Sequence, residues 1–291
     1  MEKPTILVTG ATGQLGMEFR KLSVNSNYNF IFADRNLMDF SNLESIRDFF
    51  ENQTVAIIIN CAAYTAVDKA ESEQVLANKI NGESVRLLAT IAAEKGIFLI
   101  HFSTDYVFDG KGYRPYPIDY PTDPVNTYGM SKCAGEEAML QTNGLNGMIV
   151  RTSWVYSEFG NNFVKTMMRL GAERAQLNVI NDQIGSPTYA GDLAKFILDN
   201  LPKLTWKGVK IYHYSNEGAC SWYDFAHAIM ELTKLPCTIH PIPSSQYPTP
   251  AQRPHYSVLD KSKTRENFQT SIPHWRDSLK VCLSNLSETN A

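Results

Sequence analysis

Cysteine, paired histidines and long apolar runs are all scarce in this chain. Its five cysteines have unrelated spacings and leave one without a partner, so we expect reduced thiols rather than a disulfide framework. The six histidines are scattered, with no pair at ligand spacing, and we predict no metal site. The longest apolar run, from Val55 to Ala63, is interrupted by Asn60 and is too short to span a bilayer, which argues against a membrane partner.

A strong excess of either charge is also missing. The 27 basic and 30 acidic residues give a formal net charge of −3, which argues against a nucleic-acid partner. Any anionic ligand must therefore be held by local features. The opening residues, MEKPTILVTG, lack the charged and then apolar layout of a signal peptide. Together with the reduced thiols, this predicts a cytoplasmic protein.

The first half of the sequence alternates short β-branched runs with longer amphipathic stretches. The runs predict five buried strands, at Thr5–Thr9, Asn29–Ala33, Val55–Asn60, Ile97–Ser103 and Met148–Arg151. Helices are predicted between them, at Leu15–Leu22, Asn42–Glu51, Glu71–Lys95 and Thr127–Gln141. This alternation predicts an α/β fold of the Rossmann type, a doubly wound parallel sheet that binds ligands beyond the carboxyl ends of its strands.

The pattern changes after Arg151. Segments rich in aromatics and prolines now separate helical stretches, which are predicted at Phe163–Arg174, Gly191–Leu201, Ser221–Leu232 and Ser278–Leu286. We predict an NAD(P)-binding domain over residues 1–152, to which segments at roughly 185–215 return. Residues 153–291 are expected to form mainly a smaller C-terminal α/β lobe that binds the substrate.

The first predicted strand ends in a glycine-rich turn. Its spacing is G-x-x-G-x-x-G, formed by Gly10, Gly13 and Gly16 with Gln14 and Leu15 between the last two. Glycines permit a tight turn and a close approach of the backbone to a pyrophosphate. The helix that follows offers unpaired N–H groups and the positive end of its dipole. The turn therefore predicts a dinucleotide cofactor.

Residues after the second and third strands leave several choices open. Asp34 would favour NAD by accepting hydrogen bonds from the ribose, whereas Arg35 would favour NADP by binding a 2′-phosphate. An ordinary exposed ion pair is the alternative. Phe40 could pack near the adenine or belong to the core. Small residues in Asn60–Tyr64 would let the backbone pass close to a ring, or simply allow tight helix packing.

Tyr128 and Lys132 form the candidate catalytic pair. Four residues apart on one predicted helix, they share a face. A free tyrosine has a pKa of about 10, and a nearby lysine cation is expected to lower that pKa and so suit the phenol to acid–base catalysis. Thr104, with Ser103 as the alternative, would hold the substrate carbonyl, unless it only caps the strand end. Asn81 could carry a water relay behind Lys132, or be an ordinary mid-helix residue.

Several longer stretches carry a resemblance to a known family. They are Ala63-Tyr-Thr-Ala-Val-Asp-Lys-Ala-Glu71, Ser103-Thr-Asp-Tyr-Val-Phe-Asp109, Arg151-Thr-Ser-Trp-Val-Tyr156, Asn161-Asn-Phe-Val-Lys-Thr-Met167, Val179-Ile-Asn-Asp-Gln183 with Gly185-Ser-Pro-Thr188, and Tyr247-Pro-Thr-Pro-Ala-Gln-Arg-Pro254. With the glycine turn and the tyrosine–lysine pair, they make the chain resemble the extended short-chain dehydrogenase/reductases. Within that superfamily it is most similar to the dTDP-4-dehydrorhamnose reductases.

The resemblance implies reduction of the C4 keto group of dTDP-4-dehydro-6-deoxy-L-mannose, with NADPH or NADH, to dTDP-β-L-rhamnose. The implied cofactor contacts are Gly13, Gln14, Leu15, Asp34, Asp39, Phe40, Ala62, Ala63, Tyr64, Tyr128 and Lys132. The implied sugar-nucleotide contacts are Thr104, Asp105, Tyr128 and Trp154. Some members bind magnesium, which maps to no carboxylates here, and a homodimer is a further expectation.

Trp154, and Arg253 as a further candidate for substrate binding, could each have a purely structural role instead. Trp154 would offer an apolar wall to a deoxysugar face, but could equally be a core tryptophan at a domain seam. Arg253 would pair with the diphosphate, or be an ordinary exposed arginine.

Other activities of the same superfamily are weighed against reduction. Related dehydratases have an Asp-Glu pair directly after the threonine, whereas here Asp105 is followed by Tyr106. The second acid needed to remove and return protons is therefore absent, and reduction is favoured over dehydration. Another nucleotide-sugar reductase, an epimerase, and a non-catalytic regulatory subunit of the same fold remain the alternatives.

Overall fold

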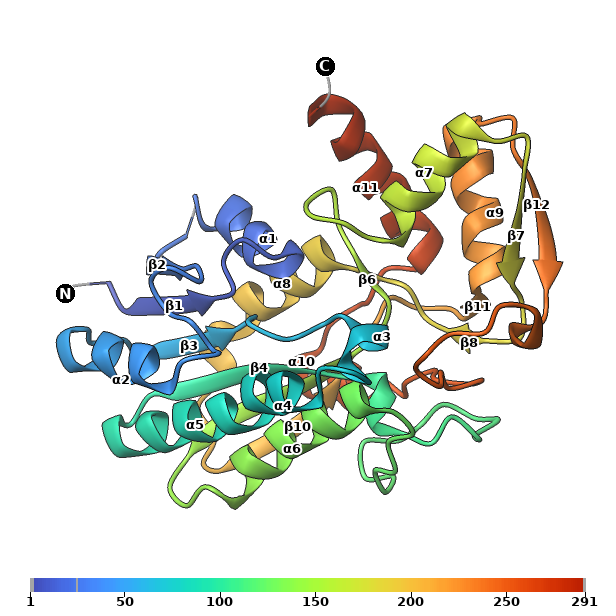
Figure 1. Cartoon of the computed structure of the whole chain (residues 1–291). Coiled ribbons are helices and arrows are strands. Elements are labelled where there is room, and N and C mark those ends of the chain that lie inside the picture. Colours follow the sequence, from blue (N-terminus) through green and yellow to red (C-terminus); the bar gives the residue numbers. More distant parts are fainter. Residues whose placement is uncertain (1–2, 25, 290–291) are drawn as a thin grey trace.

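Six parallel strands form the central sheet, in the order β10-β5-β4-β3-β1-β2 (Figure 1). The structure is a computed structural model that describes residues 3–24 and 26–289, so residues 1–2, 25, 290 and 291 of the predicted domains lie outside it. The strands are β1 (Thr5–Thr9), β2 (Asn29–Ala33), β3 (Ile57–Asn60), β4 (Phe98–Thr104), β5 (Asn146–Thr152) and β10 (Val209–His213). The predicted Rossmann-type parallel sheet is confirmed.

The strand order reverses at β1, which pairs with β2 on one side and β3 on the other. Its last residue, Thr9, is in register with Ala33 of β2 and with Asn60 of β3. In a doubly wound sheet, the crevice at such a switch point is where ligands bind. β2 was predicted to be buried, but its side chains are mostly half-buried because it is the edge strand.

Helices cover both faces of this sheet (Figure 1). Helices α1 (Gln14–Ser23) and α8 (Ala190–Asn200) pack on the face that carries Ile6 and Val8. The opposite face carries Leu7 and Leu99 and is covered by α2 (Leu43–Asn52), α5 (Ser84–Lys95) and α6 (Thr127–Gln141). Alternate residues of a strand point to opposite faces, so each buried strand contributes to two cores.

The single helix predicted over Glu71–Lys95 is interrupted. The chain instead forms α3 (Val67–Ala70), α4 (Gln74–Asn78), a π-helical turn (Lys79–Glu83) and then α5. The wider turn contains Asn81, whose buried side chain bonds both backbone groups of Tyr64 and the Ser131 hydroxyl. Asn81 is therefore a structural clamp rather than a solvated mid-helix residue. Gly135 lets α6 approach this turn, because a Cβ there would collide with the Asn81 carbonyl.

A second core lies beside the sheet, around Met167, Phe225 and Trp275. It is enclosed by helices α7 (Phe163–Glu173), α9 (Trp222–Thr233) and α11 (Trp275–Thr289), with α10 (Ser262–Phe268) nearer the large sheet. Its strands pair two by two: β6 (Val155–Tyr156) with β9 (Thr188–Tyr189), β8 (Ile184–Gly185) with β11 (Cys220–Ser221), and β7 (Gln176–Ile180) with β12 (Thr238–Ile242).

The sequence did not predict the strands of this smaller part. β7 alternates exposed and buried residues, whereas β12 is exposed at three of its five positions and contains Pro241. Proline cannot donate to a ladder and is tolerated because β12 is paired on one side only. After β9 the chain returns to the large sheet, where α8 packs against α1 and β10 pairs with β5. Within the described residues, no helix is both long and apolar enough to cross a membrane.

A buried pair of carboxyl groups joins α1 to the smaller part. Glu18 is 1% exposed and accepts a hydrogen bond of 2.7 Å from Ser157. Its neighbour Glu158 accepts from Lys21 at 2.6 Å and from the Tyr189 hydroxyl at 2.9 Å. Burial raises the pKa of Glu18 to about 8, and the neighbouring Glu158 acts in the same direction. Glu18 therefore holds a proton at neutral pH, while Glu158 is the charged member.

We predict that the protein loses stability as the pH rises from about 5 to about 8. The folded-state pKa of Glu18 lies above its unfolded value, so the folded protein binds the extra proton and loses this advantage as that proton leaves. The slope should be at most about 1.4 kcal/mol per pH unit. Urea unfolding across this range would measure it. Glu18→Gln should flatten the curve, and Glu94→Gln, on the exposed side of α5, should not. Equal slopes in both variants would contradict the assignment.

Candidate functional site

The glycine turn lies at the carboxyl end of β1 and is sterically required. Gly10 has a φ of +60°, and a Cβ there would lie 2.6 Å from the amide nitrogen of Ala62. A Cβ on Gly16 would lie 2.7 Å from Cα of Ala11. Gly13 begins α1 without any side-chain cap, so the first amides of the helix, including that of Gln14, are open to an anion. The geometry suits the predicted pyrophosphate.

The carboxylate of Asp34 is engaged by its own turn. Its Oδ1 accepts hydrogen bonds from the amides of Asn36 and Leu37, at 3.0 and 3.1 Å. Arg35 is exposed and directs its guanidinium toward Asp39 and Ser41, each 3.4 Å away. This end of the sheet therefore presents an arginine and a hydroxyl, with the first carboxylate used in capping.

The other predicted cofactor contacts are divided between surface and core. The ring of Phe40 belongs to the core on the α2 and α5 side, which favours a core residue over a contact with the adenine. Ala62 and Ala63 follow β3 at the sheet edge, and the Ala62 amide donates to the Thr9 hydroxyl at 3.2 Å. Tyr64 is held through its backbone by Asn81 and donates its hydroxyl to Glu73 at 2.7 Å.

The start of α6 is fixed by three separate contacts. Asn126 caps the helix by accepting from the Gly129 amide at 2.8 Å, and it donates to the carbonyl of Gln252 at 2.7 Å. Glu71 accepts from the amide and hydroxyl of Thr127, at 2.9 and 3.0 Å. Capping and the helix dipole both favour this carboxylate. Tyr128, in the first turn, is thereby placed against the end of β4.

The phenol of Tyr128 is a protonated group in this environment. Burial raises its pKa to about 12; a hydrogen bond with Thr104 opposes this, and the Asp105 carboxyl adds to it. The ring packs edge-on against Tyr106, with centroids 5.9 Å apart. The expected lowering of this pKa by Lys132 is wrong for the cofactor-free protein, because burial raises the pKa and the Lys132 amine contacts His101 instead.

The amine of Lys132 is buried behind the tyrosine. The residue is 2% exposed, and its Nζ lies 3.3 Å from Nε2 of His101 on β4. Burial lowers the pKa of Lys132 to about 8, against the smaller opposing effects of Glu136 and Cys61. Glu136 itself forms a buried ion pair of 2.7 Å with Arg151.

Thr104 rather than Ser103 is the hydroxyl that meets the tyrosine. Thr104 donates to Asp105 Oδ1 at 3.0 Å and accepts from the Tyr106 amide at 3.2 Å, so it also caps the short turn that follows. Ser103 Oγ and Asp105 Oδ2 are both buried, and neither has a partner at normal hydrogen-bond distance among the described residues, although the Ser257 hydroxyl is near enough to oppose the rise of the Asp105 pKa. Burial raises the pKa of Asp105 to about 6. The cluster can therefore hold and donate protons near a polar ligand.

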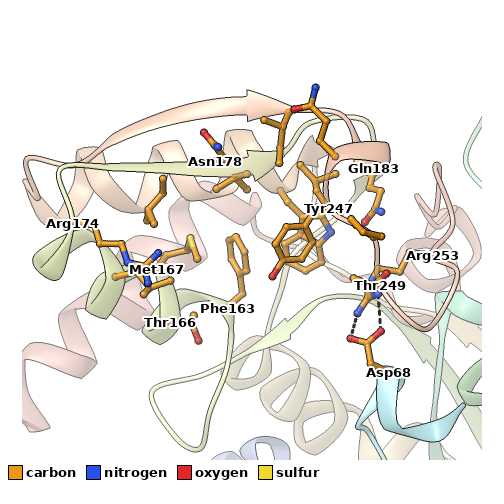
Figure 2. A pocket seen from close by; sticks show the side chains of 18 of the residues that line it. Asp68, Phe163, Thr166, Met167, Arg174, Asn178, Gln183, Tyr247, Thr249 and Arg253 are labelled. Carbon is orange, nitrogen blue, oxygen red and sulfur yellow. Dashed lines mark hydrogen bonds and ion pairs between the residues drawn. The ribbon is translucent and has the colours of Figure 1, made fainter. Parts of the chain in front are cut away.

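A cavity of about 1030 Å³ opens between α7, β7, β12 and the loop that contains Pro248 and Pro250 (Figure 2). Aromatic walls are supplied by Phe163, Trp222 and Tyr247, and cationic groups by Arg174 and Arg253. Aromatic faces and guanidinium groups are suited to a heterocyclic base and its phosphates. The cavity is therefore the candidate nucleotide pocket of the smaller part.

Arg253 lies on the wall of this cavity but is already paired. Its two terminal nitrogens bind the carboxylate of Asp68 at 2.8 and 3.0 Å, as Figure 2 shows. The ring of Trp154 stacks on Trp222 at 3.6 Å, and Trp154 has a φ of +49°. Trp222, not Trp154, contributes to the cavity lining.

The sequence interpretation missed most of the cavity residues. Phe163 and Trp222 each occupy the first position of a helix, and neither was singled out. Arg174 and Tyr247 were equally overlooked. Two of these positions lie within quoted stretches, 161–167 and 247–254, whose aromatic residues were a usable signal. Among the described residues, no group of three or more histidine, cysteine, aspartate or glutamate side chains is placed to hold a metal ion.

Comparison with known proteins gives one consistent answer. The family described as RmlD substrate binding domain matches residues 4–288. The chain is 41% identical to dTDP-4-dehydrorhamnose reductase of Escherichia coli (strain K12), covering 98% of this chain and 99% of that one. It is also 41% identical to the spore coat polysaccharide biosynthesis protein SpsK of Bacillus subtilis (strain 168), covering 97% and 98%.

Solved structures agree. A dTDP-4-dehydrorhamnose reductase from Bacillus anthracis, in complex with NADP, superposes with a TM-score of 0.93 at 37% identity, covering 98% of this chain and 100% of that one. UDP-glucose 4-epimerase of Thermus thermophilus has a TM-score of 0.81 at 17% identity over 97% and 99%, a likeness of fold alone. Sequence and fold together establish that this chain belongs to the dTDP-4-dehydrorhamnose reductase family.

Proposed function

We propose that the protein reduces the C4 keto group of dTDP-4-dehydro-6-deoxy-L-mannose to give dTDP-β-L-rhamnose. As a member of its family the chain is an NAD(P)H-dependent oxidoreductase, and NADPH is the proposed reductant. The observation that carries the proposal is the protonated phenol of Tyr128, which lies beside Thr104 and Asp105 at the carboxyl end of β4.

The large sheet is proposed to hold the cofactor. The open amides at the start of α1 and the close backbone approach at Gly10 suit the pyrophosphate. Lys132 would hydrogen-bond the nicotinamide ribose from beneath. When bound, the reduced nicotinamide supplies a hydride. We assign residues 1–152 and roughly 185–215 to this half, supported by the pairing of β10 with β5, and 153–291 mainly to the sugar-nucleotide lobe.

Tyr128 is the proposed proton donor. A ketone oxygen gains negative charge as its carbon is reduced, and it must be protonated as that charge develops. A phenol with a pKa of about 12 keeps its proton until such an oxygen is present. Thr104, hydrogen-bonded to Tyr128, would orient the oxygen, and the buried Asp105 Oδ2 would accept from a neighbouring sugar hydroxyl.

The cavity is the proposed site of the thymidine diphosphate. Phe163, Trp222 and Tyr247 offer faces for the base, and Arg174 adds a positive charge at the rim. The guanidinium of Arg253, while paired with the Asp68 carboxylate, would bind the diphosphate. Trp154, stacked behind Trp222, would support the wall rather than form it.

Mixing the purified protein with NADPH and enzymatically generated dTDP-4-dehydrorhamnose tests the proposal. We expect the near-ultraviolet absorbance of the reduced nicotinamide to fall as dTDP-rhamnose accumulates. Folded protein that shows no turnover with a verified substrate would refute the activity. Co-purification with a stoichiometric partner, without turnover, would favour a regulatory subunit instead.

Tyr128→Phe should lower kcat by about 10²–10⁴-fold, the usual contribution of a general acid. The dissociation constant for NADPH should change little, because the ring and the helix remain. Cofactor titration by fluorescence, alongside steady-state kinetics, separates the two effects. Tyr113→Phe, on an exposed tyrosine, is the matched control and should behave as the unaltered protein. A near-normal kcat for Tyr128→Phe would mean that the acid is misassigned.

The protein should prefer NADPH to NADH. One carboxylate oxygen of Asp34, Oδ1, is occupied in its own turn, whereas Arg35 is exposed beside Ser41 and can receive a 2′-phosphate. Arg35→Gln should lower the ratio of kcat/KM for NADPH over NADH by about tenfold or more, since a hydrogen bond to a charged group contributes about 1.5–3 kcal/mol. Arg47→Gln, on the exposed surface of α2, should leave the ratio unchanged. An unchanged ratio in Arg35→Gln would overturn this assignment.

A further inference from the structure

A continuous chain of buried polar groups links β1 to the catalytic helix. The Thr9 hydroxyl lies 2.6 Å from Oδ1 of Asn60, and Nδ2 of Asn60 lies 3.0 Å from Nδ1 of His101. Nε2 of His101 then lies 3.3 Å from Nζ of Lys132. All four residues are almost completely buried, and they come from β1, β3, β4 and α6. The proposed reaction assigns no role to Thr9, Asn60 or His101.

The direction of these hydrogen bonds follows from the fixed end of the chain. The backbone amide of Ala62 can only donate, and it donates to Thr9 Oγ1 at 3.2 Å. The contact of 2.6 Å between Thr9 and Asn60 is short for N–H···O but normal for O–H···O. The hydroxyl therefore donates to the amide oxygen, and the amide nitrogen of Asn60 faces His101. Nδ1 of His101 must then be the acceptor.

This direction decides which proton His101 carries. Burial, and then the nearby Lys132, hold the pKa of His101 well below its usual range, so the imidazole is neutral. A neutral imidazole with an accepting Nδ1 has its hydrogen on Nε2, the nitrogen that faces Lys132. An N–H directed at Nζ suits the free amine as acceptor and opposes the ammonium, which can only donate.

The other groups around Lys132 do not impose this direction. The Cys61 thiol follows β3, and it acts on the Lys132 pKa less than burial and Glu136 do. Glu136, on the same helix as Lys132, is held in the ion pair with Arg151 of β5. Tyr128, also on α6, is a neutral phenol. His101 is therefore the group that makes a directed hydrogen-bonding contact with the amine.

We propose that Thr9, Asn60 and His101 form a positioning device for Lys132, which fixes its Nζ under the sheet edge and, through the Nε2–H tautomer of His101, controls its protonation. The device acts on the reaction only through Lys132 and rests on the proposed function for the role of that residue. Where the cleft offers hydrogen-bond acceptors, the Lys132 amine is protonated and donates to them. Where it offers none, the amine can gain or lose a proton.

Nitrogen-15 NMR of the histidine rings tests the tautomer without any substrate. Two-bond correlations distinguish Nδ1–H from Nε2–H imidazoles, and the His101 signals are assigned by their loss in His101→Gln. We expect the Nε2–H form for His101 in the cofactor-free protein, still neutral at about pH 6.5, where half of a free imidazole is protonated. An Nδ1–H tautomer, or a protonated ring at neutral pH, would overturn the proposal. Absence of reductase activity would leave this result unaffected.

Asn60→Asp should reverse the hydrogen bonds on both sides of His101, while Thr9 continues to donate to residue 60. A carboxylate accepts from both Thr9 and His101, so the hydrogen of His101 should move to Nδ1 and Nε2 should accept from the Lys132 ammonium. The alkaline midpoint of kcat/KM for NADPH, which reports the free enzyme, should rise by about one pH unit. If the protein shows no turnover, the pH dependence of NADPH binding gives the same midpoint.

His213→Gln is the matched control, because His213 is a buried histidine of β10, which is separated from β4 by β5, and it does not contact Lys132. It should lower stability without moving the midpoint. A merely structural role for the chain predicts the same result for Asn60→Asp. An unmoved midpoint in that variant would therefore contradict the proposal, and the tautomer measurement remains decisive if the variant fails to fold.

Discussion

The burial of the Lys132 amine beneath the sheet edge is the constraint on which the rest of the site depends. A charged amine is costly to bury, so its protonation is sensitive to every polar group that touches it. The helix can carry it there because Gly135 lets α6 lie against the π-helical turn. Caps by Asn126 and Glu71 then fix the first turn of α6. The tyrosine one turn earlier is held in place by the same contacts.

Acid and cation have separate environments although they lie on one helix face. Tyr128 meets Thr104 and Asp105 at the end of β4, and its proton is tightly held. Lys132 lies deeper and titrates near neutral pH. Such a pair suits the protonation of a ketone oxygen, which needs a donor that releases its proton only to a developing charge. Tyr106, packed edge-on against Tyr128, directly follows Asp105, and its side chain carries no carboxyl group.

Local signals in the sequence were sufficient for five of the six strands of the large sheet, whereas β10 was not predicted as a strand. β1, β2 and α6 match their predicted bounds, because each strand is brief and largely apolar and Asn126 caps the helix. The π-helical turn was not predictable, since it depends on Asn81 meeting Tyr64 and Ser131 across the fold. β7 was missed because an alternating strand lacks a buried-strand pattern, and β12 because it is mostly exposed and contains Pro241. The direction of the Tyr128 pKa shift was mispredicted, because burial raises this pKa and the Lys132 amine contacts His101 instead.

The central claim is that hydride passes from the cofactor to C4 of a sugar nucleotide in the crevice between the two parts of the protein. NADPH that carries deuterium in the transferable position at C4 of its nicotinamide tests this directly. Mass spectrometry and NMR of the product should place one deuterium on C4 of the deoxysugar. Deuterium retained in the cofactor, or found at another sugar carbon, would contradict the account.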